Sequence, residues 1–276
     1  MIRVGTRGSA LALAQAEWVG SRLGGPYELV TVEASGPVDD KSRWVSGLER
    51  SLLAGEVDIA VHSAKDVPAE LAEGLALVAI PARADPRDAI CGAASLSALP
   101  AGARVGTSSL RRAAQVRAAR SDLEVVEVRG NVDTRLRKLA DGEVDALVLA
   151  LAGLHRLGRA DDVGGVLDEL IPAAGQGALA VEARPGQVGL EGLVDPEATA
   201  CVLAERELTR ALGASCNTPV GAYARVVDGA LELAAWVGRA DGSAWISDRR
   251  SGPASSGLGA RVAERLLSAG AAEMLA

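Results

Sequence analysis

Two short sequence patterns each occur twice in this chain, in the same order, and this repeat constrains the fold more than any other feature. Arg3-Val4-Gly5-Thr6-Arg7 leads into a helical stretch, and Arg104-Val105-Gly106-Thr107-Ser108 does the same. Gly55-Glu56-Val57-Asp58 is later matched by Gly142-Glu143-Val144-Asp145, so the spacing is 50 residues in the first copy (5 to 55) and 36 in the second (106 to 142). Chance matches are the alternative in an alanine-rich chain, but the shared order predicts two similarly built lobes, the second more compact.

The region that contains both copies alternates between short β-branched or leucine-rich runs and alanine-rich helical stretches, up to about residue 185. This alternation is typical of α/β lobes in which helices cover a sheet. The predicted strands are Ile2–Gly5, Leu29–Ala34, Val57–Val61, Leu75–Ile80, Ala89–Gly92, Arg104–Gly106, Glu124–Val128 and Asp145–Ala150. The predicted helices are Ala10–Leu23, Trp44–Ala54, Leu110–Arg120, Val132–Ala140 and a stretch near Asp162–Leu167.

The pattern changes after the Pro185-Gly186 break, where hairpin signals replace the alternation. Asp228-Gly229 and Asp241-Gly242 are strong hairpin-turn dipeptides, and they separate three apolar runs. The predicted elements are a helix at Glu197–Leu212, strands at Val220–Val227, Leu231–Gly238 and Trp245–Arg250, and an amphipathic helix at Arg261–Leu275. We therefore expect a third, small α+β domain in which helices cover one face of an antiparallel sheet.

The composition is that of a globular protein. Hydrophobic residues make up 49% and charged residues 24% of the 276 residues, which excludes disordered, collagen-like and coiled-coil chains. At about 150 residues per domain, this length favours two domains or two with a small addition. Aromatic residues make up only 2%, with no Phe, which disfavours a nucleic-acid protein built on stacking platforms. No apolar run reaches the roughly 18 residues of a membrane span, so neither nucleic acid nor a membrane is an expected partner.

Charge is unevenly distributed along the chain. The net charge is −7, but residues 101–160 hold eleven basic and seven acidic residues, and arginine dominates the basic ones. A locally basic, arginine-rich middle in an acidic chain suggests a small anionic ligand held in one place.

The cysteines and the N-terminal residues indicate the cellular compartment in which the protein is expected. Cys91, Cys201 and Cys216 are odd in number and unevenly spaced, which fits neither a disulfide framework nor a zinc site and favours a reducing cytoplasm. The first residues resemble a secretory signal, because Arg3 and Arg7 precede an apolar run at 10–14. We favour a strand that leads into a helix instead, because this apolar run is short for a signal.

Two lobe-opening turns place hydroxyl groups and backbone amides where a predicted strand meets a helix. They are Thr6-Arg7-Gly8-Ser9 and Thr107-Ser108-Ser109, and each offers an N-cap and the positive end of a helix dipole. Arg111-Arg112 follows the second turn, and Arg129-Gly130-Asn131 with Arg135 opens the next helix similarly. Ordinary caps with solvated arginines are the alternative, but arginine suits bidentate carboxylate binding, so we favour anion sites.

A third group of polar residues, His62-Ser63-Ala64-Lys65-Asp66, directly follows an apolar strand. Ligands of open α/β sheets bind outside the carboxyl ends of strands, which would place Lys65 and Asp66 next to a ligand. An exposed ion pair in a turn explains these two residues equally well. Neither His62 nor the second histidine, His155, has a partner at metal-ligand spacing, so we expect core or hydrogen-bonding roles for both and no metal site.

Cys216 lies in the small-residue loop Gly213-Ala214-Ser215-Cys216-Asn217-Thr218-Pro219. Free cysteine is usually a small buried hydrophobe, an interpretation that fits Cys91 and Cys201. A cysteine on a loop bracketed by Gly and Pro is a better candidate for covalent attachment, because exposure and the thiolate form govern reactivity. From composition alone the buried alternative remains slightly favoured for Cys216 as well.

Taken together, several long motifs closely resemble the porphobilinogen deaminase (hydroxymethylbilane synthase) family over almost the whole chain. The matching motifs are Thr6–Ala12, Val61–Pro68, Asp85–Asp88, Val105–Arg112, Arg129–Arg135, Ala152–Gly158, Gly175–Ala178 and the Cys216 loop. One short motif would be unspecific, whereas this many in the right order make the resemblance highly specific.

The resemblance implies two similar periplasmic-binding-protein-like α/β lobes around an active-site cleft, with a small α+β third domain that carries a cysteine. The expected division is residues 1–82 with 176–196 for lobe 1, 83–175 for lobe 2 and 197–276 for the cofactor-attachment domain. By the same resemblance, Cys216 holds a dipyrromethane cofactor through a thioether. This cofactor primes the addition of four porphobilinogens, each with loss of ammonia, before water releases hydroxymethylbilane.

The resemblance also implies roles for the charged side chains. Asp66 matches the family's catalytic aspartate, with Lys65 beside it, and a fixed carboxylate can stabilise positive charge on a pyrrole nitrogen when ammonia leaves. Each pyrrole carries an acetate and a propionate group, so the growing oligomer is strongly anionic. The residues that match cofactor and carboxylate binders are Arg7, Ser9, Lys65, Thr107, Ser109, Arg111, Arg112, Arg129, Arg135, Arg156 and Gln176.

The main departure from the family pattern lies between Ser35 and Trp44. The family has a longer, glycine-rich lid there, with a lysine and an aromatic residue, and Lys41 and Trp44 match those two positions. We expect the shorter segment to affect how the lid closes over the active site and how the length of the growing pyrrole chain is controlled.

The leading hypothesis is a cytoplasmic, monomeric transferase of heme and tetrapyrrole biosynthesis that acts on porphobilinogen. A non-catalytic or divergent relative that binds a tetrapyrrole or polycarboxylate is the first alternative, and the presence of both Asp66 and Cys216 argues against it. An exported solute-binding protein is the second alternative, and it fails if Arg7 and Ser9 belong to the site.

Overall fold

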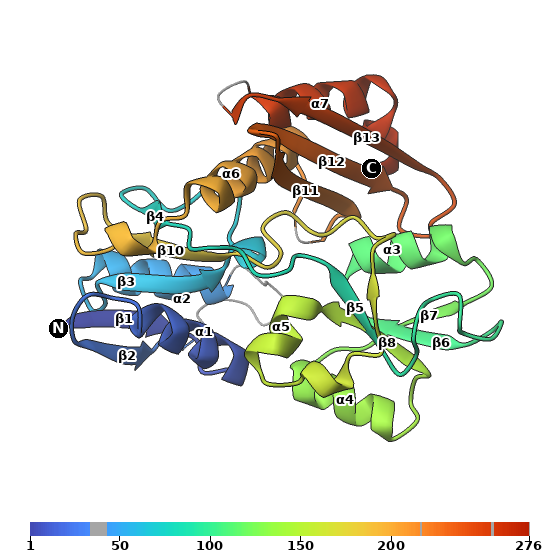
Figure 1. The fold of residues 1–276 in the computed structure, drawn as a ribbon, viewed down its shortest axis with the longest axis horizontal. Coiled ribbons are helices and arrows are strands. Elements are labelled where there is room, and N and C mark those ends of the chain that lie inside the picture. Colours follow the sequence, from blue (N-terminus) through green and yellow to red (C-terminus); the bar gives the residue numbers. More distant parts are fainter. Residues whose placement is uncertain (34–42, 216, 255–256, 276) are drawn as a thin grey trace.

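The computed structural model describes residues 1–33, 43–215, 217–254 and 257–275, and this part contains two five-stranded sheets of matching topology. The first sheet has the order β2 (Tyr27–Thr31), β1 (Ile2–Thr6), β3 (Ile59–Ser63), β10 (Leu179–Ala183), β4 (Ala76–Ala79). The second has the order β7 (Glu124–Glu127), β6 (Arg104–Thr107), β8 (Ala146–Ala150), β5 (Asp88–Cys91), β9 (Gly165–Leu167). In each sheet the first three strands are parallel, and the fourth is antiparallel to both neighbours. The predicted pair of similar α/β lobes is therefore confirmed (Figure 1).

The sequence repeat makes the same backbone contact in both lobes. Asp58 N–H donates to Arg3 O at 2.9 Å, and Arg3 N–H donates back to Asp58 Oδ2 at 2.8 Å. Asp145 and Arg104 form the same pair, at 2.9 and 2.6 Å. The two patterns recur together because each aspartate binds the backbone of the strand that opens its lobe.

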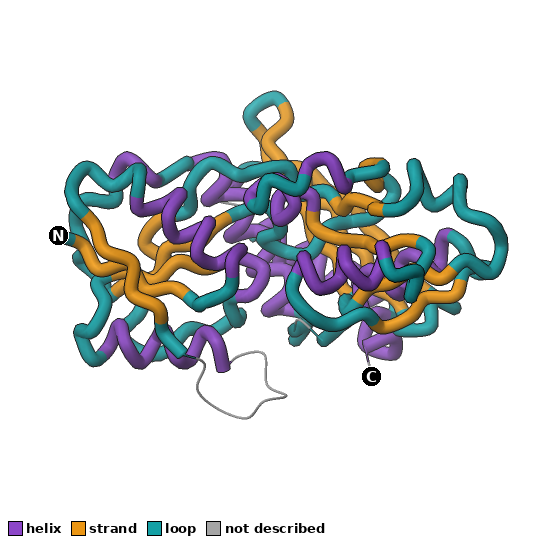
Figure 2. Tube along the Cα trace, turned by 90° about the horizontal axis from the view of Figure 1, so that it is seen from below, coloured by secondary structure: helices purple, strands orange, loops and turns teal. Residues whose placement is uncertain are grey.

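Helices cover both faces of each sheet, because successive residues of a strand point to opposite sides. Ile59 and Val61 of β3 lie in the apolar cluster of one covering helix, whereas Ala60 lies in that of the other. Figure 2 shows helices on both sides of the strands in the half of the molecule that contains the N-terminus. The helices on the first sheet are α1 (Ala10–Gly20) and α2 (Arg43–Leu53), and those on the second are α3 (Leu110–Ala119), α4 (Val132–Ala140) and α5 (Leu151–Arg156).

The chain crosses between the lobes twice, from β4 to β5 and from β9 to β10, through residues 80–87 and 168–178. These two crossover segments bind each other. Ala84 N–H donates to Gly177 O at 3.2 Å, and Gln176 Nε2 donates to Pro86 O at 2.7 Å. Gly177 has a φ of +84°, and a Cβ there would collide with Ala84 O, so the approach of the two segments requires glycine.

The third domain consists of one antiparallel sheet with helices on one face, as predicted. Its core includes Leu208, Leu233, Val262 and Leu266, which are fully buried in one cluster. Figure 1 shows this domain, in orange to red, over the junction of the two lobes. Its elements are α6 (Pro196–Ala211), β11 (Val220–Val227), β12 (Ala230–Gly238), β13 (Trp245–Gly252), α7 (Leu258–Ser268) and α8 (Ala271–Leu275).

Most predicted elements are confirmed with small changes at their ends, and some are wrong. The helix expected near Asp162–Leu167 is a short 3-10 turn at Ala160–Asp162 followed by β9. Gly164 and Gly165 explain why this segment is not a helix. Glycine disfavours a helix, and both residues approach the 93–94 backbone too closely for a Cβ. Helix α5 and strand β10 were not among the predicted elements, and β2 lies earlier than expected, at Tyr27–Thr31.

The closing helix is also interrupted, which the amphipathic pattern did not predict. Gly270 has a φ of +98° and separates α7 from α8, because a left-handed residue ends a helix. In the part of the chain that the structure describes, no helix is long and apolar enough to cross a bilayer.

Candidate active site

The first group of site residues lies at the carboxyl ends of β1 and β3, which are neighbouring parallel strands. Arg7 follows β1, and the 3-10 turn Ala64–Asp66 follows β3 and carries Lys65 and Asp66. Arg7 Nη2 lies 3.5 Å from Asp66 Oδ2, and the Asp66 side chain is 44% exposed. The two polar turns that the sequence singled out in this lobe therefore meet at one edge of the sheet, and Asp66 keeps a face open to a ligand.

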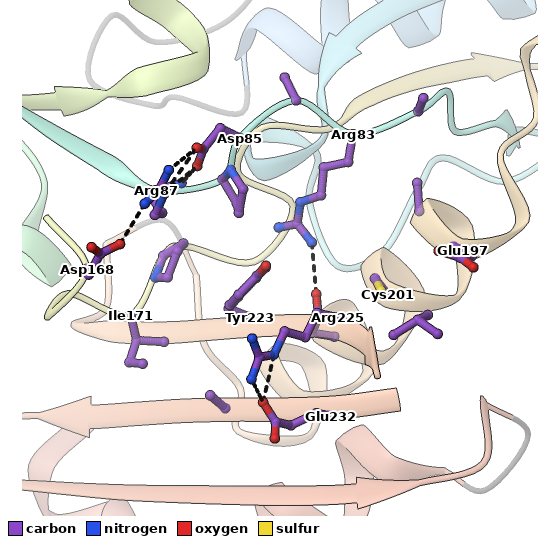
Figure 3. A pocket seen from close by; sticks show the side chains of 18 of the residues that line it. Arg83, Asp85, Arg87, Asp168, Ile171, Glu197, Cys201, Tyr223, Arg225 and Glu232 are labelled. Atoms are coloured by element: carbon purple, nitrogen blue, oxygen red, sulfur yellow. Dashed lines mark hydrogen bonds and ion pairs between the residues drawn. The ribbon is translucent and has the colours of Figure 1, made fainter. Parts of the chain in front are cut away.

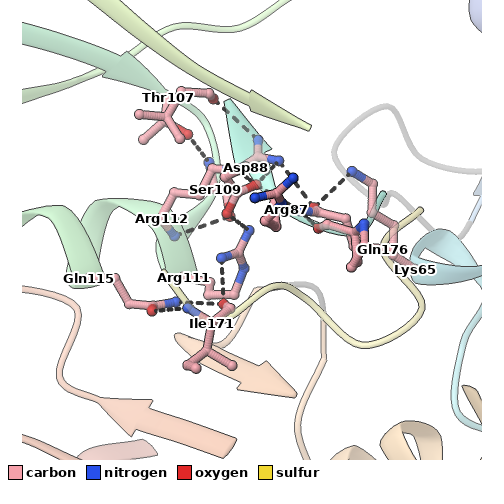
Figure 4. Close-up of polar contacts among 12 residues, drawn as sticks. Lys65, Arg87, Asp88, Thr107, Ser109, Arg111, Arg112, Gln115, Ile171 and Gln176 are labelled. Carbon is pink, nitrogen blue, oxygen red and sulfur yellow. Dashed lines mark hydrogen bonds and ion pairs between the residues drawn. The ribbon is translucent and has the colours of Figure 1, made fainter. Parts of the chain in front are cut away.

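The second group is a buried ion cluster around Asp88, the first residue of β5. Arg111 Nη2 lies 2.8 Å from Asp88 Oδ2, and Arg112 Nη2 lies 2.8 Å from Asp88 Oδ1. Gln176 Nε2 donates to Asp88 Oδ1 at 2.7 Å. Figure 4 shows both guanidinium groups converging on this carboxylate from the start of α3. The single negative charge of Asp88 neutralises only one of the two arginine charges, so the cluster keeps a surplus positive charge.

Gln176 connects the two groups. Its Oε1 accepts from Lys65 Nζ at 3.4 Å and from Arg112 Nη2 at 3.2 Å. Lys65 belongs to the first sheet's strand-end turn and Arg112 to the helix of the second sheet, while Gln176 lies on the second crossover segment (Figure 4). The structure therefore brings Lys65, Arg111, Arg112 and Gln176 into one continuous network.

Burial and charge shift the pKa values in this network. Burial raises the pKa of Asp88, but Arg111 and Arg112 outweigh it and bring that pKa down to about 2. Burial, with repulsion from Arg112, lowers the pKa of Lys65 to about 8. Burial also lowers the pKa of Arg111, whose Nε is buried and has no acceptor among the described residues. Such an unsatisfied cationic donor is what a bound carboxylate would satisfy.

Two further predicted arginines lie near the network, and one does not. Arg156 Nη2 donates to Gly177 O at 2.6 Å, and burial lowers the pKa of Arg156 to about 10. Burial and the charge of Arg112 lower the pKa of Arg135. Arg129 is 78% exposed and pairs with Glu127 at 2.9 Å, so the described structure does not join it to the cluster.

The three predicted hydroxyl groups are used in turns and helix caps. Ser9 Oγ accepts from Ala12 N–H at 3.3 Å, and Ser109 Oγ accepts from Arg112 N–H at 3.4 Å. Thr107 Oγ1 accepts from Ser109 N–H at 3.2 Å. The caps expected at both lobe-opening turns are confirmed at Ser9 and Ser109, and a hydroxyl that accepts a hydrogen bond can still donate its own proton.

Some of the predicted residues lie outside what the structure describes. Cys216 and Lys41 fall outside the described residues, and Trp44 belongs to α2 with a side chain that is not described. On either side of Cys216, Ser215 N–H donates to Thr218 Oγ1 at 2.9 Å and Asn217 N–H donates to Ser215 Oγ at 3.2 Å.

The two other cysteines and His62 are buried, as expected for residues with a structural role, whereas His155 is not. Cys91 and Cys201 are buried, and burial raises the pKa of each thiol to about 11. His62 is buried with Nε2 3.0 Å from Glu182 Oε2, whereas His155 is exposed on α5, so a core role for it is wrong. Within the described ranges no group of three or more His, Cys, Asp or Glu residues is arranged to hold a metal ion.

Asp88, at the centre of the ion cluster, is not among the predicted site residues. It belongs to the motif Asp85–Asp88, which is one of the motifs that resemble the family. The available signal was an acidic residue directly before the apolar run Ala89–Cys91, because a carboxylate at the start of a buried strand needs a cationic partner.

A pocket of about 740 Å³ lies between the crossover segments and the sheet of the third domain (Figure 3). None of the predicted site residues lines it. Its arginines are paired: Arg83 with Glu205 at 2.6 Å, Arg87 with Asp85 at 2.6 Å, and Arg225 with Glu232 at 2.7 Å, a carboxylate that Arg249 shares at 3.5 Å. Of these pairs, Arg83–Glu205 joins the first crossover segment to α6 of the third domain, whereas the other two lie within one segment or within the third domain.

Fold and site together define a two-lobed α/β protein with a surplus of buried cations at the junction of its lobes and an added α+β domain. Comparison with known proteins narrows this class: the chain belongs to the porphobilinogen deaminase family of transferases. Residues 2–192 match the family domain described as "Porphobilinogen deaminase, dipyromethane cofactor binding domain", and residues 199–268 match "Porphobilinogen deaminase, C-terminal domain". The resemblance predicted from the motifs is confirmed, and so is the expected cofactor, dipyrromethane.

The matches to curated relatives extend over the whole chain. The porphobilinogen deaminase of Chromobacterium violaceum is 45% identical over 299 residues, covering 100% of this chain and 97% of that protein. That of Desulforudis audaxviator is 47% identical over 297 residues, covering 99% and 96%. Among solved structures, immunogenic lipoprotein A of Vibrio vulnificus is similar with 15% identity and a TM-score of 0.46, over 70% of this chain and 93% of that one. The methionine binding protein MetQ is similar with 17% identity and a TM-score of 0.44, over 70% and 88%.

Proposed function

We propose that this chain condenses four porphobilinogen molecules, with loss of ammonia, onto a covalently bound dipyrromethane primer and releases hydroxymethylbilane by hydrolysis. Family membership over the full length supports the reaction. The observation that carries the assignment of the site is the Asp88 cluster, in which two buried arginines share one carboxylate and Arg111 Nε has no acceptor among the described residues.

The residues present fit a cofactor that bears acetate and propionate groups. Buried cations with incomplete partners cost free energy, and carboxylates of a ligand offset that cost. When bound, the dipyrromethane supplies the free pyrrole carbon to which substrate is added. Its carboxylates would be held by Arg111, Arg112, Lys65, Arg135 and Arg156, with Ser9, Thr107, Ser109 and Gln176 as hydrogen-bonding partners.

Asp66 is the proposed catalytic residue. Its carboxylate is accessible, and Arg7 is 3.5 Å away, so the side chain is oriented while one face stays open. A fixed negative charge there stabilises the positive charge that develops on the substrate's pyrrole nitrogen as ammonia leaves. Lys65, on the adjacent position, faces Gln176 and is placed to bind a substrate carboxylate.

The remaining assignments belong to the same proposal. Lobe 1 comprises residues 1–82 and 176–196, lobe 2 residues 83–175 and the attachment domain residues 197–276, a division supported by the return of β10 to the first sheet. Cys216 carries the thioether, Arg7 and Arg129 bind carboxylates of the growing chain, and Lys41 with Trp44 forms a short lid. The enzyme acts as a cytoplasmic monomer without nucleic acid or membrane partners.

Intact-mass measurement with peptide mapping tests this function. Protein produced with porphobilinogen available is expected to carry a two-pyrrole adduct on Cys216 and to release hydroxymethylbilane when substrate is added. A bare Cys216 after incubation with porphobilinogen, together with retained binding of a polycarboxylate, would instead support the non-catalytic relative.

A further inference from the structure

The turn between β12 and β13 contacts the helix that carries Arg111 and Arg112. Arg117 Nη1 of α3 donates to Ala240 O of this turn at 2.8 Å. Gly242, in the same turn, lies so close to α3 that a Cβ would stand 2.6 Å from Arg117 Cβ. Figure 1 shows the connection between β12 and β13 reaching from the third domain to α3. The contact therefore joins the third domain directly to the second lobe.

The second crossover segment holds α3 at another point. Gln115 binds both backbone groups of Ile171, accepting from its N–H at 2.7 Å and donating to its O at 2.9 Å. Ile171 O also accepts from Arg111 Nη1 at 2.7 Å. The next residue, Pro172, accepts from Ala222 N–H of β11 at 2.8 Å. Helix α3 is thus attached to the third domain both directly and through residues 171–172.

The third domain is attached to the first lobe beside the catalytic turn. Arg206 of α6 donates to Val67 O at 3.0 Å and to Pro68 O at 2.6 Å, immediately after Asp66. Val202 of α6 is buried in the same cluster as Ala64. One domain therefore contacts both the segment of Lys65 and Asp66 and the helix of Arg111 and Arg112.

We propose that the β12–β13 turn is a positioning element for substrate binding, in which Gly242 and Arg117 set where Arg111 and Arg112 lie relative to Asp66. This inference rests on the proposed function and extends it, because it gives the attachment domain a second task besides carrying the cofactor. Gly242 and Arg117 do not touch substrate; they act through the placement of α3.

A matched pair of alanine variants tests the positioning role. Gly242→Ala adds a Cβ against α3, at a φ of +75°. Gly229→Ala is the control, because Gly229 lies in the other Asp-Gly turn with a φ of +77° and a Cβ there meets no described atom within 4 Å. Both variants impose the same backbone strain, but only the first disturbs the contact with α3.

Gly242→Ala is expected to lower kcat/KM for porphobilinogen on the order of tenfold, mainly through a higher KM, because small displacements of binding groups have large effects. It is also expected to increase hydrogen exchange of the amides of residues 110–119. Gly229→Ala is expected to stay within about twofold of the parent in both readouts, as a distant and independent site. Arg117→Lys, which loses the donor geometry toward Ala240 without adding a Cβ clash, is expected to change KM and exchange in the same direction as Gly242→Ala.

Equal KM and equal exchange in the Gly242 and Gly229 variants would overturn the proposal, and so would a Gly242 variant that loses thermal stability alone. If the Gly242 variant does not fold, unchanged KM and exchange in Arg117→Lys would overturn it. A parent protein without a pyrrole adduct or product contradicts the proposed function instead, and the exchange comparison then decides the positioning of α3 separately.

Discussion

Asp88 Oδ1 and Arg112 Nη2 lie 2.8 Å apart in a buried ion pair that joins the start of β5 to the start of α3. Arg111 binds the other oxygen of the same carboxylate. Asp88 therefore holds two of the arginines that we assign to carboxylate binding, and it does so at the point where the first crossover segment enters the second sheet.

Asp88→Asn is expected to lower the free energy of unfolding by about 3–5 kcal/mol, because it leaves two buried cations without a counter-charge. Denaturant unfolding measures this loss. Asp168→Asn is the control, since Asp168 is 75% exposed and pairs with Arg87 at the surface, where an ion pair contributes little. Similar losses in the two variants would contradict the assigned role of Asp88.

The same pair predicts an acid-dependent loss of stability. The pKa of Asp88 in the folded chain, about 2, lies below its ordinary value of 3.8, so its contribution is fully present above about pH 4. The contribution is lost as the pH falls from about 4 toward 2, because protonation removes the charge that binds Arg111 and Arg112. Unfolding curves across this range should show a shallower pH dependence for Asp88→Asn than for the parent, and identical curves would refute the prediction.

The lowered pKa of Lys65 predicts that substrate binding weakens at high pH. Burial and Arg112 lower its pKa to about 8, so the ammonium that would bind a substrate carboxylate is charged below that pH and lost above it. The pH dependence of kcat/KM reports the ionisation of groups in the free enzyme, so we expect kcat/KM to fall as the pH rises through about 8. Lys65→Arg keeps its charge over this range, and its profile should lack this decline. The same decline in Lys65→Arg would show that another group titrates.

Asp66→Asn is expected to reduce kcat by at least about 100-fold while the protein stays folded. The neutral amide cannot stabilise developing positive charge, and electrostatic contributions of this kind are commonly that large. Because the Asp66 side chain is 44% exposed and binds one arginine, its loss should leave the thermal midpoint nearly unchanged. Product assays and thermal unfolding check the two parts, and normal turnover would remove Asp66 from the mechanism.

Cys216→Ser is expected to abolish the covalent pyrrole adduct, whereas Cys201→Ser should retain it. Cys201 is buried and its thiol pKa is raised to about 11, so it is a poor nucleophile and makes a suitable control. Intact mass distinguishes the variants. An adduct that persists in Cys216→Ser would place the attachment elsewhere.

Local sequence was sufficient where a segment's own residues determine its structure. The helix Val132–Ala140 was predicted at both ends, because Asn131 caps it by accepting from Thr134 N–H at 2.9 Å and a glycine follows its end. The strand Val220–Val227 was also predicted at both ends, since Asp228-Gly229 forms the turn after it. The repeat predicted two lobes because the Arg3–Asp58 and Arg104–Asp145 contacts are the same contact.

Segments whose structure depends on distant partners were not predicted correctly. Residues 165–167 form a strand only because β5 lies beside them, and β10 joins a sheet whose other strands lie about a hundred residues or more earlier in the chain. Local pattern carries no information about such a partner, so tertiary pairing overrides it.

The family, the two lobes, most helices and strands, and the residue types that an anionic substrate requires could therefore all be predicted from the order of the amino acids. Three contacts of the site became visible in the folded chain alone: Asp88 binds Arg111 and Arg112, Gln176 connects Lys65 to Arg112, and Gly242 contacts α3. The physical reason is that these contacts join segments far apart in the chain, which the paired crossover segments and the third domain bring together.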